Sequence, residues 1–350
     1  MNIKGKNRKN LRRHTFNSLL RRLKQGGFHK DFVQKAILPE WWNDACGKQS
    51  ELITEVEIRI ARFLELSLDN VKNPDFSFAP SEYENVLLRQ VRFADVNRLA
   101  PAIHSALKIG EAVVRNLRNV ECFQENIPSD ALFWRHQILK SRKTVTLDLL
   151  LENLWGRGIP VVPINVLPAP AFQGIACMMD DRPVILLGQR HDEPGHVAFI
   201  IAHEAGHIAV GDCTPGQPVV DEADKVDDDA VGDAADMERD ADSFASLALL
   251  GSETLPELTG ENYRQIAEQA DQIEQDTGAD ASLIIFAWAK KTGKYEMATM
   301  AVKALYCNVG AMRKLRRYFD HHINLEDASE TDRLLLSCVY GDTEINEMPC

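Results

Sequence analysis

One apolar segment constrains the fold of this 350-residue chain more than any other feature. Residues 196–210 read HVAFIIAHEAGHIAV, and His203, Glu204 and His207 interrupt a run that is otherwise apolar on every side of a helix. Such a helix is buried rather than amphipathic. Buried titratable side chains cost free energy unless they are paired. The segment therefore predicts a core helix that carries a polar site.

The three polar residues form an HExxH motif, His203-Glu204-Ala205-Gly206-His207. Histidines four residues apart share one helix face, with Cβ atoms about 5–6 Å apart, so both imidazoles can bind one Zn²⁺. Glu204 is rotated away from the pair but can still reach a metal-bound water, which is the position of the general base in zinc peptidases. The alternative is a pair of structural histidines. The motif favours Zn²⁺ with Glu204 as the catalytic residue.

A catalytic zinc needs a third protein ligand, and two candidates remain open. The extended pattern HExxHxxGxxH requires Gly at 210 and His at 213, where this chain has Val210 and Cys213. Cys213 stays an alternative, because thiolate is a good zinc ligand. The other candidate is Glu238, near the start of a helix predicted over about 237–250.

Spacings of three and seven residues place Glu238 on one face of that helix with Ala241 and Ala245. The small alanines would let the helix approach the metal while Glu238 reaches it. Asp240 and Asp242 are expected to point elsewhere, into solvent. A carboxylate at a helix start can also serve only the helix dipole, which is the alternative role for Glu238.

Short strands are predicted upstream of the motif. Residues 159–164 read as one strand, and 172–179 and 183–187 as a hairpin around residues 180–182. An edge of this hairpin could bind a peptide by strand addition. Two further histidines, His191 and His196, could donate to an oxyanion, although a structural role at the helix start is the alternative.

The rest of the chain is predicted to be helical, which makes the fold α+β with helical regions on both sides of the motif. We expect a basic, helix-turn-helix-like region at 1–72, a helical connector at 84–140, the metal-binding core at 141–252 and a helical domain at 258–345. In the first region, Gly26-Gly27 ends one helix, residues 32–36 form another, Pro39 opens a third and residues 56–64 form a fourth. Four or five helices are expected in the last region.

The charge is unevenly distributed along the chain. The net charge of −12 argues against a protein that coats nucleic acid over its whole surface. Residues 1–40 nevertheless contain eleven Lys or Arg against two acids, while residues 221–242 contain eleven Asp or Glu against two bases. The first segment could contact DNA, and the second could bind a basic partner or remain a solvated loop.

Cysteine usage and hydropathy indicate a cytoplasmic protein without a membrane partner. The seven cysteines are odd in number and form no CxxC pair, which favours a reduced compartment. No apolar signal region follows the basic N-terminus, and no apolar run reaches the length of a membrane span.

The pattern of HExxH followed by ExxA-D-x-F-A resembles the ImmA/IrrE family of zinc metallopeptidases. The matching residues are His203-Glu204-Ala205-Gly206-His207 and Glu238 through Ala245, within about residues 145–250. The resemblance implies a zincin-like, gluzincin-type core in which His203, His207 and Glu238 bind Zn²⁺ and Glu204 is the base. It also implies cleavage of a helix-turn-helix repressor in a stress or mobile-element response. The acidic segment 211–237 and the last hundred residues depart from the family pattern.

Two other functions remain open. The chain could be a DNA-binding transcriptional regulator that uses residues 1–72, with the metal domain as a sensor or structural element. It could instead be an interaction protein whose acidic segment docks a basic partner. The substrate, the activating signal and the oligomeric state do not follow from the sequence.

Overall fold

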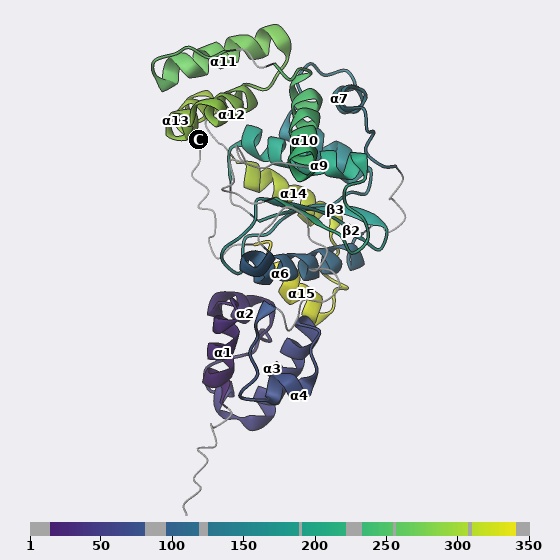
Figure 1. The fold of residues 1–350 in the computed structure, drawn as a ribbon, viewed down its shortest axis with the longest axis vertical. Helices are drawn as coiled ribbons and strands as arrows, with labels where there is room; N and C mark the ends of the chain where they lie inside the picture. The colour runs from purple at the N-terminus through teal and green to yellow at the C-terminus, as the bar shows by residue number, and fades with distance from the viewer. Residues whose placement is uncertain are drawn as a thin grey trace, which may run out of the picture.

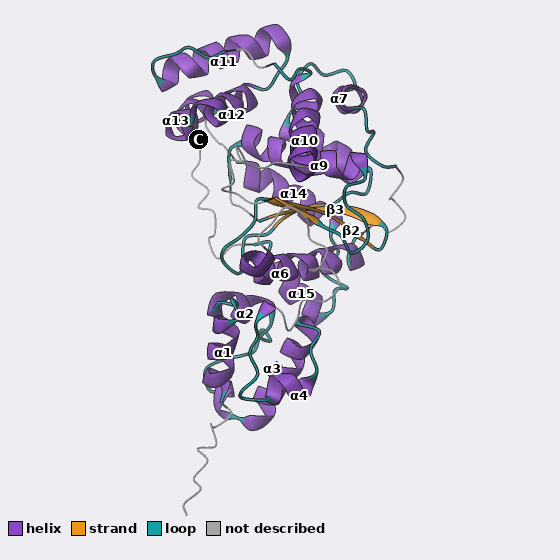
Figure 2. Cartoon of the chain, in the orientation of Figure 1, coloured by secondary structure: helices purple, strands orange, loops and turns teal. Residues whose placement is uncertain are grey.

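The computed structural model describes residues 15–80, 96–118, 125–188, 191–221, 233–254, 257–306 and 310–340. Most of these residues are helical, and four strands form one small mixed sheet (Figure 2). The predicted α+β class is confirmed at this level. The helices before the sheet are α1 (Phe16–Gln25), α2 (Lys30–Ala36), the 3₁₀ helix η1 (Cys46–Lys48), α3 (Ser50–Phe63), α4 (Leu68–Lys72), α6 (Val96–Arg115), α7 (Ala131–Leu139) and α8 (Leu147–Gly156).

The strands are β1 (Val161–Pro163), β2 (Gly174–Met179), β3 (Arg182–Leu187) and β4 (Val219–Asp221). The remaining helices are α9 (Pro194–Val210), α10 (Asp233–Leu250), α11 (Tyr263–Thr277), α12 (Ala281–Thr292), α13 (Tyr295–Leu305), α14 (Ala311–His322) and α15 (Glu330–Ser337). Among the described residues, no helix combines the length and the apolar character needed to cross a membrane.

The predicted hairpin is confirmed as β2 and β3, which pair antiparallel through a two-residue turn. Asp180 and Asp181 have φ values of 48° and 61°, the left-handed geometry that matches the twist of a tight hairpin. The sheet order is β1-β3-β2-β4, with β1 parallel to β3 and β4 antiparallel to β2. The outer edges of the hairpin are therefore paired at residues 174–176 and 185–187, which limits the part of the edge where a peptide could add.

Two helices enclose the sheet, with α6 on one face and α9 on the other (Figure 1). Helix α6 approaches closely at Gly110, where a Cβ would lie 2.4 Å from the Met179 side chain. Helix α10 packs on the side of α9 that faces away from the sheet, and α12 also contacts α9. The core helix predicted over 196–210 is thus confirmed, because α9 is buried between the sheet and other helices.

The N-terminal helices follow the prediction except at Pro39. The first, second and fourth expected helices are α1, α2 and α3. The helix expected to begin at Pro39 is wrong, because residues 39–45 form turns. The Trp42 N–H donates to the Pro39 carbonyl at 2.9 Å, and the Asn43 side chain accepts from the Ala45 N–H at 3.0 Å. Local side-chain capping by Asn competes with helix formation.

Two cations of the basic segment formed by residues 1–40 make contacts that hold these helices together. Residues 1–14 lie outside the described residues, but Arg22 is buried and donates to the carbonyls of Val71 at 2.9 Å and Asn73 at 2.7 Å. Lys35 donates to the Tyr340 carbonyl at 2.6 Å, where α2 packs against α15. These two cations therefore have partners within the chain.

The described C-terminal residues form five helices, within the predicted four or five, and these helices divide between two apolar clusters. Helices α11, α12 and α13 surround a small core that contains Ile266, Ile285 and Trp288. By contrast, α14 packs against β1 and α8. Helix α15 packs against α6 and α2 (Figure 1). The predicted turns at Gly278 and Gly293 are left-handed helix caps, each with φ of 72°.

The hairpin turn yields a stability prediction. Replacing Asp181 by Ile should lower the free energy of unfolding by about 1–2 kcal/mol, because β-branched residues are strained at positive φ. Asp181→Asn should be nearly neutral, since Asn tolerates this conformation. Urea unfolding followed by circular dichroism measures both variants, and equal stability of the Ile and Asn proteins would contradict the assigned turn.

Candidate metal centre

Helices α9 and α10 approach each other at small residues, which brings their polar side chains together. A Cβ on Gly206 would lie 3.3 Å from the Ala241 Cα, so this glycine permits the close contact. Ala241 and Ala245 are buried in the same interface, as the spacing of the second helix predicted. The result is that Glu238 of α10 faces His203 and His207 of α9.

Three donor atoms converge at this interface. The Nε2 atoms of His203 and His207 are 3.2 Å apart, and Glu238 Oε2 lies 3.2 Å from the first. Glu238 Oε1 lies 3.6 Å from His207 Nε2. Tetrahedral ligands at Zn–N and Zn–O distances of roughly 2.0–2.1 Å are about 3.4 Å from one another. The spacing of these atoms therefore suits a single metal ion of this size.

The outer nitrogen of each histidine faces a carboxylate. His203 Nδ1 lies 3.0 Å from Asp242 Oδ1, and His207 Nδ1 lies 2.9 Å from Asp212 Oδ2. Neutral imidazoles that donate Nδ1–H to these acceptors carry lone pairs on Nε2. Both lone pairs then point toward each other and toward Glu238. Such a cluster of acceptors needs a proton or a cation at its centre.

The pKa of His203 also indicates that positive charge is favoured at the centre of this cluster. Burial lowers the pKa of this imidazole, but its hydrogen bonds to Asp242 and Glu238 outweigh burial and raise the pKa well above its usual value. A buried Glu238 oxygen, Oε1, has no hydrogen-bond partner among the described residues. A bound cation would satisfy this oxygen and replace the proton on His203. The residues present therefore fit a divalent metal.

The prediction that Asp242 points into solvent is wrong, whereas Asp240 is exposed as expected. Asp242 lies one helical turn beyond Glu238. Glu238 therefore contacts Nε2 of His203, while Asp242 contacts Nδ1 on the opposite side of the ring. Lys290 of α12 binds the second oxygen of Asp242 at 2.8 Å. Although burial opposes it, the contacts with His203 and Lys290 lower the pKa of Asp242 to about 2.

Asp212 was missed in the sequence because it follows the end of α9. Gly211 caps the helix with φ of 83°, and the chain then turns back so that the Asp212 N–H donates to the His207 carbonyl at 2.9 Å. A glycine just after a predicted helix is the usual signal of such a reversal. It places the Asp212 carboxylate beside the last histidine of the motif.

Glu204 is fully buried on the side of α9 that faces β2. A Cβ on Gly174 would lie 2.1 Å from Glu204 Oε1, so this strand glycine makes room for the carboxyl group. Neither oxygen has a well-formed hydrogen bond among the described residues. Burial raises the pKa of Glu204 well above its usual value, even though nearby His203 lowers it. The Glu204 carboxylate therefore has a high proton affinity, and it directly follows His203 in the chain.

Asp221, the last residue of β4, adds a further carboxyl group to this environment. Burial raises its pKa to about 6, the charge of His203 opposes the shift, and the charges of Glu238 and Asp242 add to it. No sequence signal marked this residue, because a three-residue strand is too short to show a periodicity. Residues 222–232, which hold much of the acidic segment, lie outside the described residues.

The other candidates do not join the three donors. Cys213 is buried near Glu204, and burial raises the pKa of its thiol to about 12, so it is not part of the His203–His207–Glu238 cluster. His191 and His196 form a separate cluster with Glu193. Burial lowers the pKa of His196 to about 3, so its imidazole is neutral. Neither histidine belongs to the His203–His207–Glu238 cluster.

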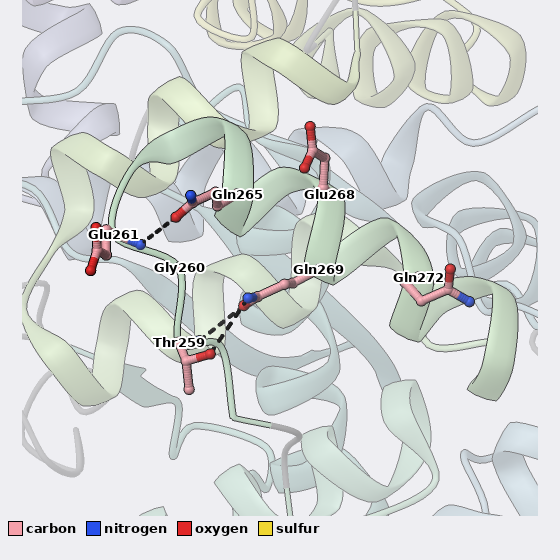
Figure 3. A pocket seen from close by; sticks show the side chains of 7 residues that line it. All are labelled: Thr259, Gly260, Glu261, Gln265, Glu268, Gln269 and Gln272. Carbon is pink, nitrogen blue, oxygen red and sulfur yellow. Dashed lines mark hydrogen bonds between the residues drawn. The ribbon is translucent and has the colours of Figure 1, made fainter.

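A polar hollow of about 660 Å³ lies on α11 and the preceding loop, and it shares no residue with the metal cluster. Figure 3 shows its lining, in which Gln269 bonds to Thr259 and Gln265 accepts from the Glu261 N–H. Its amide and carboxylate groups satisfy one another or face solvent. It therefore offers no chemistry comparable to that of the buried cluster.

No family model, curated protein or solved structure matches this chain.

Metal affinity should depend on Asp242 but not on Asp240, two residues away on the same helix. Asp242→Asn should weaken Zn²⁺ or Co²⁺ binding by about 10–100-fold, because the carboxylate fixes the tautomer and orientation of His203. Asp240→Asn is the matched control and should leave affinity unchanged. Competition with a chromogenic chelator measures both. Equal affinities of the two variants would refute the role of Asp242.

The stability of the metal-free protein should carry the pH dependence of Asp221. The folded-state pKa of about 6 exceeds the value of 3.8 expected in the unfolded chain, so wild-type stability is lost as pH rises through 6. Asp221→Asn cannot ionise. Its stability relative to wild type should therefore increase by about 2 kcal/mol between roughly pH 4.5 and 7. Urea unfolding in EDTA measures this difference, and a constant difference across the range would contradict the burial of this carboxyl group.

Proposed function

We propose that this chain is a Zn²⁺-dependent endopeptidase with a zincin-like core, related in mechanism to the ImmA/IrrE family that its motifs resemble. One observation carries the proposal, namely the convergence of His203 Nε2, His207 Nε2 and Glu238 within 3.6 Å of one another. Three ligands of this kind leave one coordination position for water, as catalytic zinc sites do. Structural zinc sites use four protein ligands instead.

The bound ion would lower the pKa of a water molecule and polarise the scissile carbonyl. The chain's own contribution begins with Glu204, which would accept the proton of that water and pass it to the leaving amine. Burial of Glu204 favours this role, because it keeps the proton affinity of the carboxylate high and excludes bulk water. Asp242 and Asp212 hold the two imidazoles in the tautomer that presents Nε2 to the metal.

The surroundings of the cluster support a peptide substrate with basic character. Val219 and Val220 of β4 are fully buried, so this support comes from charge and not from a free strand edge. Asp221 ends this strand and begins the acidic segment of residues 221–242. A helix-turn-helix repressor, which presents basic residues to DNA, is the substrate that the family resemblance suggests.

The alternative function, DNA binding through residues 1–72, would depend on exposed cations such as Arg21, Lys24 and Lys30. Arg22 is buried and bonded to backbone carbonyls, and Lys35 binds the end of α15. These two cations are therefore committed to the fold rather than to phosphate contacts. The peptidase remains the function that the geometry supports best.

Glu204→Gln should abolish cleavage while retaining zinc, because it removes the base but leaves the three ligands. We expect a loss of about 10²–10⁴-fold in the rate at which purified protein cleaves a candidate helix-turn-helix repressor. Glu268→Gln, an exposed change on α11, is the control and should cleave normally.

Two further variants separate the ligand assignment from the mechanism. Glu238→Ala should lose cleavage and the zinc ion of the His203 cluster, whereas Cys213→Ala should keep both. Normal cleavage by zinc-loaded Glu204→Gln would disprove the peptidase mechanism. If Glu238→Ala binds as many zinc ions as wild type and Cys213→Ala binds one fewer, the thiol is the third ligand.

A further inference from the structure

A second group of metal-binding side chains lies at the start of α9. His191, Glu193 and His196 each offer one donor atom, and these atoms all lie within 4.8 Å of one another. All three side chains are half-buried, so solvent can reach the group. Two imidazoles and a carboxylate are the same donor set as in the His203 cluster. This group has no part in the peptidase mechanism described above.

The backbone around these residues is firmly held. Asp192 lies between two of them, and its carboxylate accepts from the Gly310 and Met312 N–H groups at 3.0 Å each. Its carbonyl accepts from the Ala311 N–H at 3.1 Å. The segment is thereby tied to the start of α14, which fixes the directions in which the flanking side chains point. Ligands held in this way lose little conformational entropy on binding an ion.

The His196 ring is fixed on both faces. It lies 3.8 Å from the His191 ring and stacks on Phe286 of α12 at 4.0 Å, measured between ring centroids. Among the described residues, neither ring nitrogen of His196 has a hydrogen-bond partner. A half-buried imidazole that is oriented by packing, with its nitrogens uncommitted, is well suited to metal coordination.

This group is distinct from the His203 cluster. His196 and His203 are seven residues apart on one helix, which places them about 10.5 Å apart along its axis. One ion cannot bridge that distance. Among the described residues, the charge of Lys290 acts on His196. Lys290 is paired with Asp242 at 2.8 Å, so a carboxylate already offsets its repulsion of an incoming metal.

We propose that His191, Glu193 and His196 form a second binding site, for a divalent transition metal such as Zn²⁺, Ni²⁺ or Co²⁺. The imidazole donors select these ions over Mg²⁺ and Ca²⁺, which prefer oxygen ligands. The site would join the start of α9 to α12 and α14, since Phe286 and Asp192 position its ligands. Its occupancy does not depend on whether the His203 cluster acts as a peptidase.

The number of bound ions tests this proposal. Metal-free, full-length protein is titrated with Zn²⁺ at neutral pH, and bound metal is measured by equilibrium dialysis and mass spectrometry. Wild type should bind two ions, His196→Ala one, and His203→Ala/His207→Ala one. His136→Ala, which removes an exposed histidine on α7, is the control and should bind two. Combining the three site substitutions should remove both ions.

Glu193→Gln is a second, milder substitution at the same site, and it tests the proposal even if His196→Ala does not fold. It should weaken one of the two ions by at least about tenfold, which is the cost of losing even an outer-shell partner of a metal ligand. Thermal unfolding of each metal-free variant establishes that it is folded. The proposal is overturned if folded His196→Ala and Glu193→Gln bind as many ions as wild type with the same affinity. If the His203 cluster does not bind metal, His203→Ala/His207→Ala would instead bind the same number of Zn²⁺ ions as wild type.

Discussion

The organisation of this protein depends on the repulsion among three acceptors that its fold forces together. His203, His207 and Glu238 present lone pairs to one another across 3.2–3.6 Å, while Asp242 and Asp212 engage the outer nitrogens. Leaving such a group buried without positive charge costs free energy. A bound metal ion would turn the same arrangement into a stabilising one, which would couple folding to metal binding.

Helix α9 makes this arrangement possible because it is buried in the core and also contains His203, Glu204 and His207. Its apolar residues bury it between the sheet and α10, which also removes the motif from bulk water. Two glycines set the close distances. Gly206 admits α10, and Gly174 of β2 leaves space for the Glu204 carboxyl group. A larger residue at either position would displace a side chain of the cluster.

Sequence reasoning found the parts that depend on periodicity and failed where the chain reverses or a strand is very short. The apolar pattern of 196–210 predicted α9, and the i, i+3, i+7 spacing after Glu238 predicted the face that α10 presents. Asp242 lies next to the alanine face, at the i+4 position from Glu238, so the spacing of Glu238, Ala241 and Ala245 alone does not reveal its contact with His203. Asp212 depends on the left-handed cap at Gly211, and its contact with His207 arises only from that reversal.

Two other differences have similar local causes. β4 is three residues long and pairs with a strand more than forty positions earlier in the chain. No pattern in its own sequence therefore predicts the position of Asp221. The helix expected from Pro39 is replaced by turns, because an Asn side chain caps the backbone there. Both cases involve contacts or capping that a periodicity does not encode.

The ligand set of the buried cluster is the central claim, and X-ray absorption at the zinc edge tests it most directly. The sample is the His191→Ala/His196→Ala protein loaded with one equivalent of Zn²⁺, so that only this cluster is occupied. We predict a first shell of nitrogen and oxygen at roughly 2.0–2.1 Å that includes two imidazoles. Replacing Glu238 by Gln should change that shell. A sulfur scatterer near 2.3 Å, or a spectrum unaffected by Glu238→Gln, would contradict the assignment of His203, His207 and Glu238 as the ligands.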